Sequence, residues 1–131
     1  MIEGFSRMPI GRILFVDDNF ICSLENCELL REEGFSVLPL YSAPAALEHI
    51  NRHQILAALV TDIDLGPGDD GFDVARWARG AYPGLPVIYI SGTASGRHAA
   101  EGVCGSEFIS KPFNPQQVVD ALSRVMHAKA A

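Results

Sequence analysis

Four short apolar runs of this chain are each followed at once by polar side chains that could bind a metal ion or a phosphoryl group. Asp17 and Asp18 follow the first of these runs, Asp62 follows another, and Ser91 and Lys111 follow two more. Carboxylates supply the oxygen ligands that Mg²⁺ prefers, and a carboxylate can also act as the nucleophile that accepts a phosphoryl group. If these residues meet in one pocket, their carboxylates can hold a divalent cation, with an ammonium group and a hydroxyl beside it.

The spacing of the apolar runs indicates a parallel sheet with helices between its strands. Helical stretches separate five expected strands, which are residues 12–16, 35–40, 57–61, 86–90 and 107–110. This alternation is typical of βαβ units, and it predicts a doubly wound α/β fold. In such sheets ligands bind beyond the carboxyl ends of the strands, which is where all the polar residues above stand.

Two of the expected strands differ in a way that predicts their place in the sheet. The run 57–61 is apolar apart from its last residue, as expected for a central strand that is covered on both faces. The run 35–40 contains Pro39, which has no N–H to donate, so we expect this strand at an edge of the sheet.

Capping residues and apolar spacing define the helices between these strands. Ser42 is a helix cap with Pro44 in the following turn, and Asn114 and Gln117 are the two residues of a capping box. Apolar faces are expected at Ile21, Leu24, Cys27 and Leu30 in the first helix and at Val118, Val119, Leu122, Val125 and Met126 in the last.

Composition narrows the class of protein further. The 131 residues fit one domain, and the formal net charge of −6 argues against a nucleic-acid-binding surface. No apolar run approaches the roughly 20 residues of a membrane span. Cys22, Cys27 and Cys104 cannot all pair and lack zinc-site spacing, so we expect reduced, packed thiols of a cytoplasmic protein. We expect an N-terminal tail at 1–9, one domain at 10–127 and a C-terminal tail at 128–131.

The ordered set of motifs resembles the receiver domain of two-component response regulators. Its segments are VDDN at 16–19, TDID at 61–64, YISG at 89–92 and SKPF at 110–113. The resemblance extends over about residues 11–127. It implies a flavodoxin-like (βα)₅ fold with strand order 2-1-3-4-5.

The same resemblance implies a phosphoacceptor and a metal site. Asp62 would accept the phosphoryl group, and Mg²⁺ would bind to Asp17, Asp18, Asp62 and the backbone carbonyl of Asp64. The chain would take its phosphoryl group from a histidine kinase or a histidine phosphotransfer protein and hydrolyse it slowly, so it would not be a conventional enzyme.

Further residues would respond to the phosphoryl group if the resemblance holds. Lys111, joined to Pro112 by a cis bond in the family, and Ser91 would contact phosphoryl oxygens, and Gly92 would leave the approach open. Ser91 and Phe108 would form the switch. The output surface for a downstream protein would be the face made by the helix from residue 95, the strand 107–110 and the last helix. The resemblance also implies that phosphorylated copies could form a homodimer through this face.

The loop after Asp62 departs from the family pattern. Leu65 and Gly66 replace a methionine and a proline, and Pro67 comes one residue later, so the loop is one residue longer. This change lies beside the phosphorylation site and bears on hydrolysis and on kinase recognition. Phe108 also lacks the hydroxyl of the commoner tyrosine.

Two alternative functions remain open. Asp62 and Asp64 resemble the D-x-D pair of haloacid-dehalogenase-type phosphatases, although that pair follows the first strand in those enzymes. A receiver-like interaction module that is never phosphorylated is the other alternative, although such modules usually lose an acid or the lysine.

Several residues also have plain structural interpretations. Asp17 and Asp18 could be a charge pair at a helix N-terminus, and Phe108 could be an ordinary core residue. We expect Asp70 to cap a helix, Trp77 to pack, and His98 to lie on the surface.

Overall fold

The five expected strands form one parallel sheet. The structure, a computed structural model, describes residues 11–52, 54–92 and 95–130, so the tail expected at 1–9 lies outside the described residues. Strand order is β2-β1-β3-β4-β5, as the resemblance implied. The strands are β1 (Arg12–Val16), β2 (Ser36–Leu40), β3 (Leu56–Asp62), β4 (Val87–Ser91) and β5 (Glu107–Ser110).

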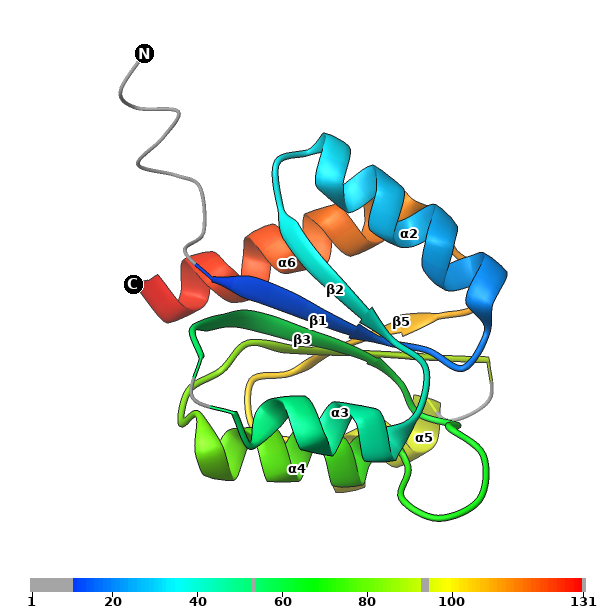
Figure 1. Ribbon diagram of the computed structural model, residues 1–131, viewed down its shortest axis with the longest axis vertical. Coiled ribbons are helices and arrows are strands. Elements are labelled where there is room, and N and C mark those ends of the chain that lie inside the picture. The colour runs from blue at the N-terminus through cyan, green and yellow to red at the C-terminus, as the bar shows by residue number, and fades with distance from the viewer. Residues whose placement is uncertain (1–10, 53, 93–94, 131) are drawn as a thin grey trace.

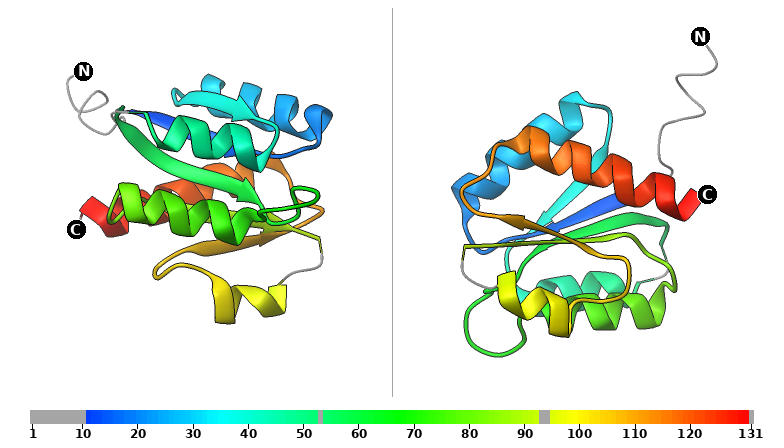
Figure 2. Two further views of the ribbon diagram at one scale, coloured as in Figure 1. Left: turned by 60° about the horizontal axis from the view of Figure 1, so that its bottom comes forward. Right: turned by 180° about the vertical axis from the view of Figure 1, so that it is seen from behind.

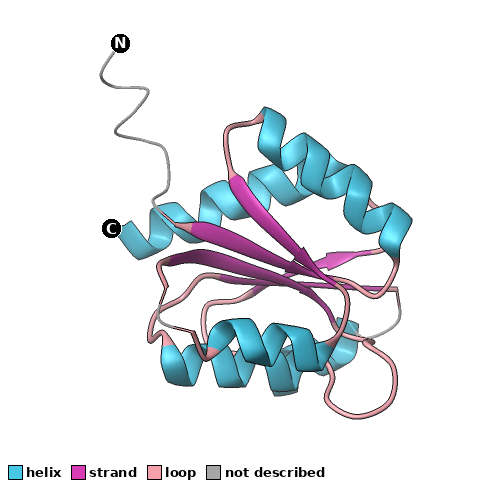
Figure 3. Cartoon of the chain, viewed as in Figure 1, coloured by secondary structure: helices cyan, strands magenta, loops and turns pink. Residues whose placement is uncertain are grey.

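Helices cover both faces of this sheet, which makes the domain three layers thick (Figures 1 and 3). The helices are α2 (Phe20–Glu32), α3 (Ala43–Ile50), α4 (Gly71–Ala81), α5 (Ser95–Glu101) and α6 (Pro115–Ala130). Helices α2 and α6 lie on one face, and α3, α4 and α5 lie on the other, as the views of Figure 2 agree. The last helix, α6, extends to Ala130.

Each face of the sheet has its own apolar core. Leu14, Leu59 and Tyr89 point toward α3 and α4, whereas the alternate residues Val60 and Ile88 point toward α2 and α6. Because successive side chains of a strand point to opposite faces, the central strands must be apolar on both sides. The uninterrupted burial of β3 from Ala58 onward therefore confirms its central place.

The expected capping residues act as predicted. The hydroxyl of Ser42 accepts a hydrogen bond from the N–H of Ala45 at 3.2 Å. Asn114 and Gln117 exchange the two hydrogen bonds of a capping box, at 2.9 and 3.2 Å. These side chains occupy helix-start amide groups that the helix itself leaves unpaired.

The inner face of α2 differs from the expected one. Cys27 and Leu30 are buried as predicted, but Ile21 is 68% exposed and Leu24 45% exposed. Ser23 and Asn26 are buried in their place. The Asn26 amide donates to the carbonyl of Cys22 at 2.8 Å, so part of its polar group is satisfied within the helix itself.

Pro39 lies at the edge of the sheet, as its missing N–H predicted. β2 is a terminal strand and pairs with β1. The carbonyl of Leu40 accepts from the N–H of Asp17 at 3.0 Å and so faces β1. Because polar groups alternate along a strand, Pro39 has its backbone groups on the open side, where its missing donor costs no bond within the sheet.

The cysteines match the expectation of packed, reduced thiols only in part. All three are free thiols, and Cys27 is buried, but Cys104 is exposed rather than packed. None of the helices within the described residues is long and apolar enough to cross a bilayer.

Candidate functional site

Three carboxylates meet where β1 and β3 end. The two strands are neighbours, and Val16 pairs with Thr61, so Asp17 and Asp62 leave the sheet side by side. Each of Asp17, Asp18 and Asp62 has an oxygen within 4.8 Å of an oxygen of the others. Asp17 and Asp62 are 1% and 4% exposed, whereas Asp18 is open to solvent. The sheet register therefore brings together the acids that the sequence placed at strand ends.

Lys111 reaches this cluster from the edge strand β5. Its Nζ lies 3.1 Å from Oδ2 of Asp62, and its backbone N–H donates to the carbonyl of Ser91 at 2.9 Å. The Lys111–Pro112 peptide bond is cis, as the resemblance implied. The side chain is 31% exposed, so Lys111 contacts the pocket while part of its side chain stays open to solvent.

Burial dominates the electrostatics of Asp62. Loss of hydration raises the pKa of Asp62 to about 6, against the lowering effect of Lys111, and the charge of Asp17 acts in the same direction as burial. Burial acts to lower the pKa of Lys111, but its hydrogen bond to Asp62 and the charge of that residue raise it above the ordinary value. The pocket is thus short of positive charge around a buried carboxylate.

The loop after β3 is anchored against Asp62 by its backbone. The N–H of Asp64 donates to Oδ1 of Asp62 at 3.2 Å, while the Asp64 side chain is exposed. At the far end of the loop, Gly71 donates its N–H to the carbonyl of Ile63 at 2.8 Å. A Cβ on Gly71 would overlap the carbonyl oxygen of Asp62, so this position requires glycine.

Ser91 and Gly92 lie where the resemblance put them, at the end of β4. Ser91 is fully buried, and it pairs with Ser110, the residue before Lys111. A Cβ on Gly92 would come no closer than 3.9 Å to the Cβ of Lys111, which is an ordinary contact. The register therefore sets Ser91 and Lys111 on adjacent strand ends.

Phe108 and His98 stack against each other, a contact that no pattern in the sequence predicts. Their ring centroids are 5.8 Å apart with an angle of 27° between the planes. His98 is half-buried rather than at the surface, because its ring also packs against that of Tyr89, with 5.4 Å between the two ring centroids. Phe108 is itself half-buried and packs against the core, so both of its interpretations fit this position.

Other interpretations of single residues have mixed outcomes. Asp70 caps α4 as expected, with Oδ1 accepting from the N–H of Asp73 at 3.0 Å. Trp77 is 52% exposed and donates to the Asn51 amide oxygen at 2.8 Å, so it packs less than expected. Arg97 was not singled out, although its spacing of four residues from Glu101 could have indicated an ion pair.

Comparison with known proteins identifies the family. The family model described as response regulator receiver domain matches residues 13–123. A response regulator receiver protein of Anaeromyxobacter sp. (strain Fw109-5) is 33% identical over 110 residues, which is 84% of this chain and 43% of the relative. The regulatory protein VanRc of Enterococcus gallinarum is 31% identical over 82% of this chain and 46% of its own. The chain therefore spans less than half the length of these two relatives.

Solved structures agree with this match. A response regulator receiver protein from Sinorhizobium medicae WSM419 superposes with a TM-score of 0.87 at 36% identity, covering 90% of this chain and 95% of that one. The receiver domain of the hybrid histidine kinase CckA gives a TM-score of 0.72 at 29% identity, covering 88% and 99%. By sequence, by strand order and by the acids at its strand ends, this chain belongs to the response regulator receiver domain family.

Proposed function

We propose that this chain is a phosphoacceptor that takes a phosphoryl group onto Asp62. The observation that supports this most is the position of one carboxylate, which is 4% exposed, lies beside two further acids, and has the Lys111 ammonium 3.1 Å from its Oδ2. A carboxylate oxygen of Asp62 attacks phosphorus in line with the departing imidazole nitrogen of a phosphohistidine. The bond to nitrogen breaks as the new P–O bond forms, and the histidine is left unmodified.

The acidic cluster fits a Mg²⁺ ion. Its donors are all carboxylate oxygens, and Asp18 is open to solvent, which suits an ion that retains several waters. Asp17, Asp18, Asp62 and the carbonyl of Asp64 would hold the ion. When bound, Mg²⁺ supplies positive charge that offsets both the repulsion among the carboxylates and the charge of the phosphoryl group.

Lys111 and Ser91 would stabilise the phosphorylated aspartate. Lys111 already contacts Asp62 and retains partial exposure, so its ammonium group can turn to a phosphoryl oxygen without a large movement. Ser91, at the end of the adjacent strand, would donate its hydroxyl to another of these oxygens. Movement of Ser91 would be transmitted to Phe108 and would alter the face made by α5, β5 and α6, which we propose as the surface for a downstream protein or a second copy.

The phosphoryl donor would be a histidine kinase or a histidine phosphotransfer protein. One relative is the sensor protein TorS of Escherichia coli, 32% identical over 65% of this chain, and another is the CckA receiver domain described above. Members of this family thus occur within kinases as well as regulators. The family match favours this role over the phosphatase alternative.

Incubation with acetyl phosphate and Mg²⁺, followed by intact-protein mass, tests the proposal. The wild-type chain should gain the mass of one phosphoryl group, and omission of Mg²⁺ should suppress the gain. Asp62→Asn should abolish it, since an amide cannot form the acyl phosphate.

Asp64→Asn is the matched control, because its exposed side chain lies two residues from Asp62 and its backbone carbonyl is kept. It should still be phosphorylated. No mass gain in the wild type, or an equal gain in Asp62→Asn, would refute the phosphoacceptor role. Rapid turnover of unrelated phosphate esters would instead support the phosphatase alternative.

A further inference from the structure

Helix α5 has little apolar contact to hold it against the domain. Among its described side chains, at residues 96–101, none is buried, and only His98 and Glu101 are half-buried. A helix of seven residues is too short to persist in water by itself. A small set of side-chain contacts must therefore keep α5 in place.

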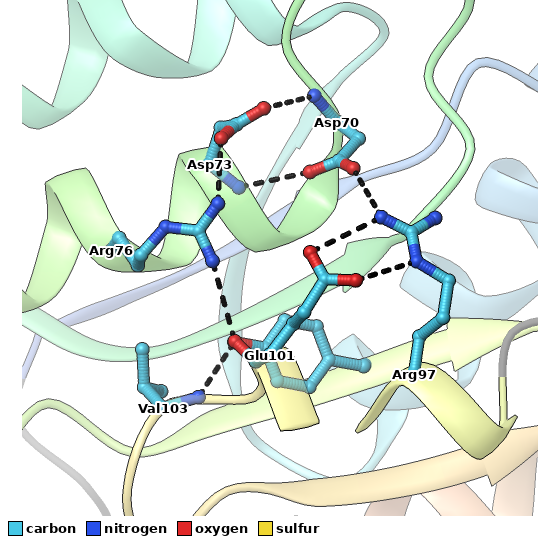
Figure 4. Close-up of polar contacts among 7 residues, drawn as sticks. Asp70, Asp73, Arg76, Arg97, Glu101 and Val103 are labelled. Atoms are coloured by element: carbon cyan, nitrogen blue, oxygen red, sulfur yellow. Dashed lines mark hydrogen bonds and ion pairs between the residues drawn. The ribbon is translucent and has the colours of Figure 1, made fainter. Parts of the chain in front are cut away.

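Arg97 ties the helix to the start of α4 (Figure 4). Its guanidinium donates to Oδ2 of Asp70 at 3.1 Å and to Oε2 of Glu101 at 2.7 Å. The same group lies over the ring of Phe72, with 5.0 Å from its central carbon to the ring centroid. One side chain thus makes three contacts, and the two with Asp70 and Phe72 both join α5 to the start of α4.

Hydrogen bonds from two other elements hold the far end of α5. Arg76 of α4 donates to the carbonyl of Glu101 at 3.3 Å (Figure 4). The N–H of Val103 donates to the hydroxyl of Tyr89 at 3.1 Å. Tyr89 is fully buried in β4. The chain just after α5 is thereby attached to the sheet through one tyrosine hydroxyl.

His98 fastens the middle of the helix. Its ring contacts those of Tyr89 and Phe108, and its Nε2 is 2.9 Å from the hydroxyl of Ser106. That hydroxyl donates to the carbonyl of Val103 at 2.6 Å, so it accepts from His98, and Nε2 carries the proton. His98 therefore contacts two aromatic rings and a polar partner at once.

We propose that Asp70, Arg97 and His98 form a latch that holds α5 over the aromatic rings beneath it, and that α5 detaches as a unit when this latch opens. Ion pairs as exposed as those of Arg97 contribute little individually, so opening should require far less free energy than global unfolding. Opening uncovers the rings of Phe72 and Tyr89, both fully buried while α5 is docked. This property belongs to the unmodified chain and does not depend on phosphoryl transfer to Asp62.

Residue-resolved amide hydrogen exchange of the whole chain tests the latch. The reporters are the N–H of Gly102, bonded to the carbonyl of His98 at 2.9 Å, and the N–H of Val103. Leu59 of β3, bonded to the carbonyl of Pro86 at 2.9 Å, reports on the core. The N–H groups of Gly102 and Val103, just after α5, should exchange at least about tenfold faster than that of Leu59. Their exchange rates should change little at low urea concentrations, because a local opening exposes little surface.

Substitutions then separate the latch from its surroundings. Arg97→Gln and Asp70→Asn should each speed exchange at the two reporters by about threefold and leave Leu59 unchanged. Asparagine is as good a helix cap as aspartate, so Asp70→Asn removes the charge and retains the start of α4. Arg124→Gln removes a comparably exposed ion pair, between α6 and Glu107 of β5, that does not include Arg97 or Asp70, and it should leave the reporters unchanged.

Two results would overturn the latch. One is exchange of Gly102 and Val103 as slow as that of Leu59 in the wild type, which would mean that α5 opens only with the whole domain. The other is a set of substitution effects that does not single out Arg97. Either an unchanged reporter rate in Arg97→Gln, or an acceleration in Arg124→Gln equal to that in Arg97→Gln, would mean that the Arg97 contacts do not hold the helix. His98→Ala, which removes the stacked ring, should also accelerate both reporters.

Discussion

The acidic site and helix α5 are held in place by different forces. Asp17 and Asp62 extend from central strands whose apolar side chains are buried on both faces, so backbone register fixes their positions. Helix α5 is held instead by the ends of a few polar and aromatic side chains, among them Arg97 and His98. A substitution of a charged side chain in the site should therefore change the charge of the site more than its geometry. A substitution among the side chains that hold α5 should instead change the position of the helix.

Gly71→Ala should produce the largest effect, because it disturbs the backbone that the site depends on. The added Cβ would overlap the carbonyl oxygen of Asp62 and come within 2.8 Å of the Cα of Ile63, and backbone atoms cannot move aside cheaply. We expect a loss of about 3 kcal/mol in the free energy of unfolding, measured by urea titration. Gly80→Ala, on the exposed side of α4 with no atom within 4 Å, should be neutral or stabilising. Equal losses of unfolding free energy in Gly71→Ala and Gly80→Ala would show that close backbone packing at Gly71 is not what the stability depends on.

Asp62→Asn should increase stability when divalent cations are absent. The pKa of Asp62 is raised from 3.8 to about 6 in the folded chain, chiefly by burial, so its charge destabilises the fold above the unfolded pKa. Wild-type stability should thus fall as the pH rises from about 4 to 6, and Asn should recover about 1–3 kcal/mol at pH 7. Urea unfolding in EDTA at about pH 4 and 7 measures this gain, which should shrink at the lower pH. A gain of the same size at both would exclude titration of Asp62 as its cause.

Mg²⁺ should stabilise the wild-type chain more modestly. A ligand that binds only the folded state adds about 1 kcal/mol when its concentration is about five times its dissociation constant. Asp18→Asn removes one carboxylate that is open to solvent, so it should reduce the Mg²⁺-dependent rise in melting temperature with little change in the metal-free protein. Calorimetry of both proteins with and without Mg²⁺ measures this difference. A rise in melting temperature in Asp18→Asn as large as that of the wild type would mean that Asp18 does not bind the metal.

The smallest effect is expected for Arg124→Gln. Arg124 and Glu107 are 60% and 31% exposed, and water screens such pairs. The urea midpoint of this variant should not differ measurably from that of the wild type. A clearly lower urea midpoint would mean that exposed ion pairs stabilise this domain substantially, and that the weak hold on α5 cannot be inferred from the exposure of its ion pairs.

The elements that set the site were predictable from sequence because strong local signals agree with the tertiary fold. β1 and β5 have the predicted bounds, and Pro39 correctly placed β2 at an edge. The acids at strand ends converge because parallel strands share one direction, so alternation alone predicts their meeting.

What the sequence did not reveal depends on contacts between distant segments. Asp70 was predicted as a cap, but its ion pair with Arg97 spans 27 residues and leaves no periodic signal. His98 was predicted at the surface because a single polar residue in a short helix carries no pattern, and only the folded chain brings Tyr89 and Phe108 to its ring. The prediction for the inner face of α2 was wrong although the sequence does carry a pattern there. Ile21 and Leu24 match helical periodicity but point outward.

Pro39 also affects how separate molecules of this protein can associate. A terminal strand offers its outward N–H and C=O groups to any strand that approaches, which is how sheets join into larger aggregates. Because Leu40 turns its carbonyl toward Asp17, the missing N–H of Pro39 falls on that outward side. An incoming strand would find a gap in the row of donors near the C-terminal end of β2, so continuous pairing between the sheets of two molecules is discouraged along this edge.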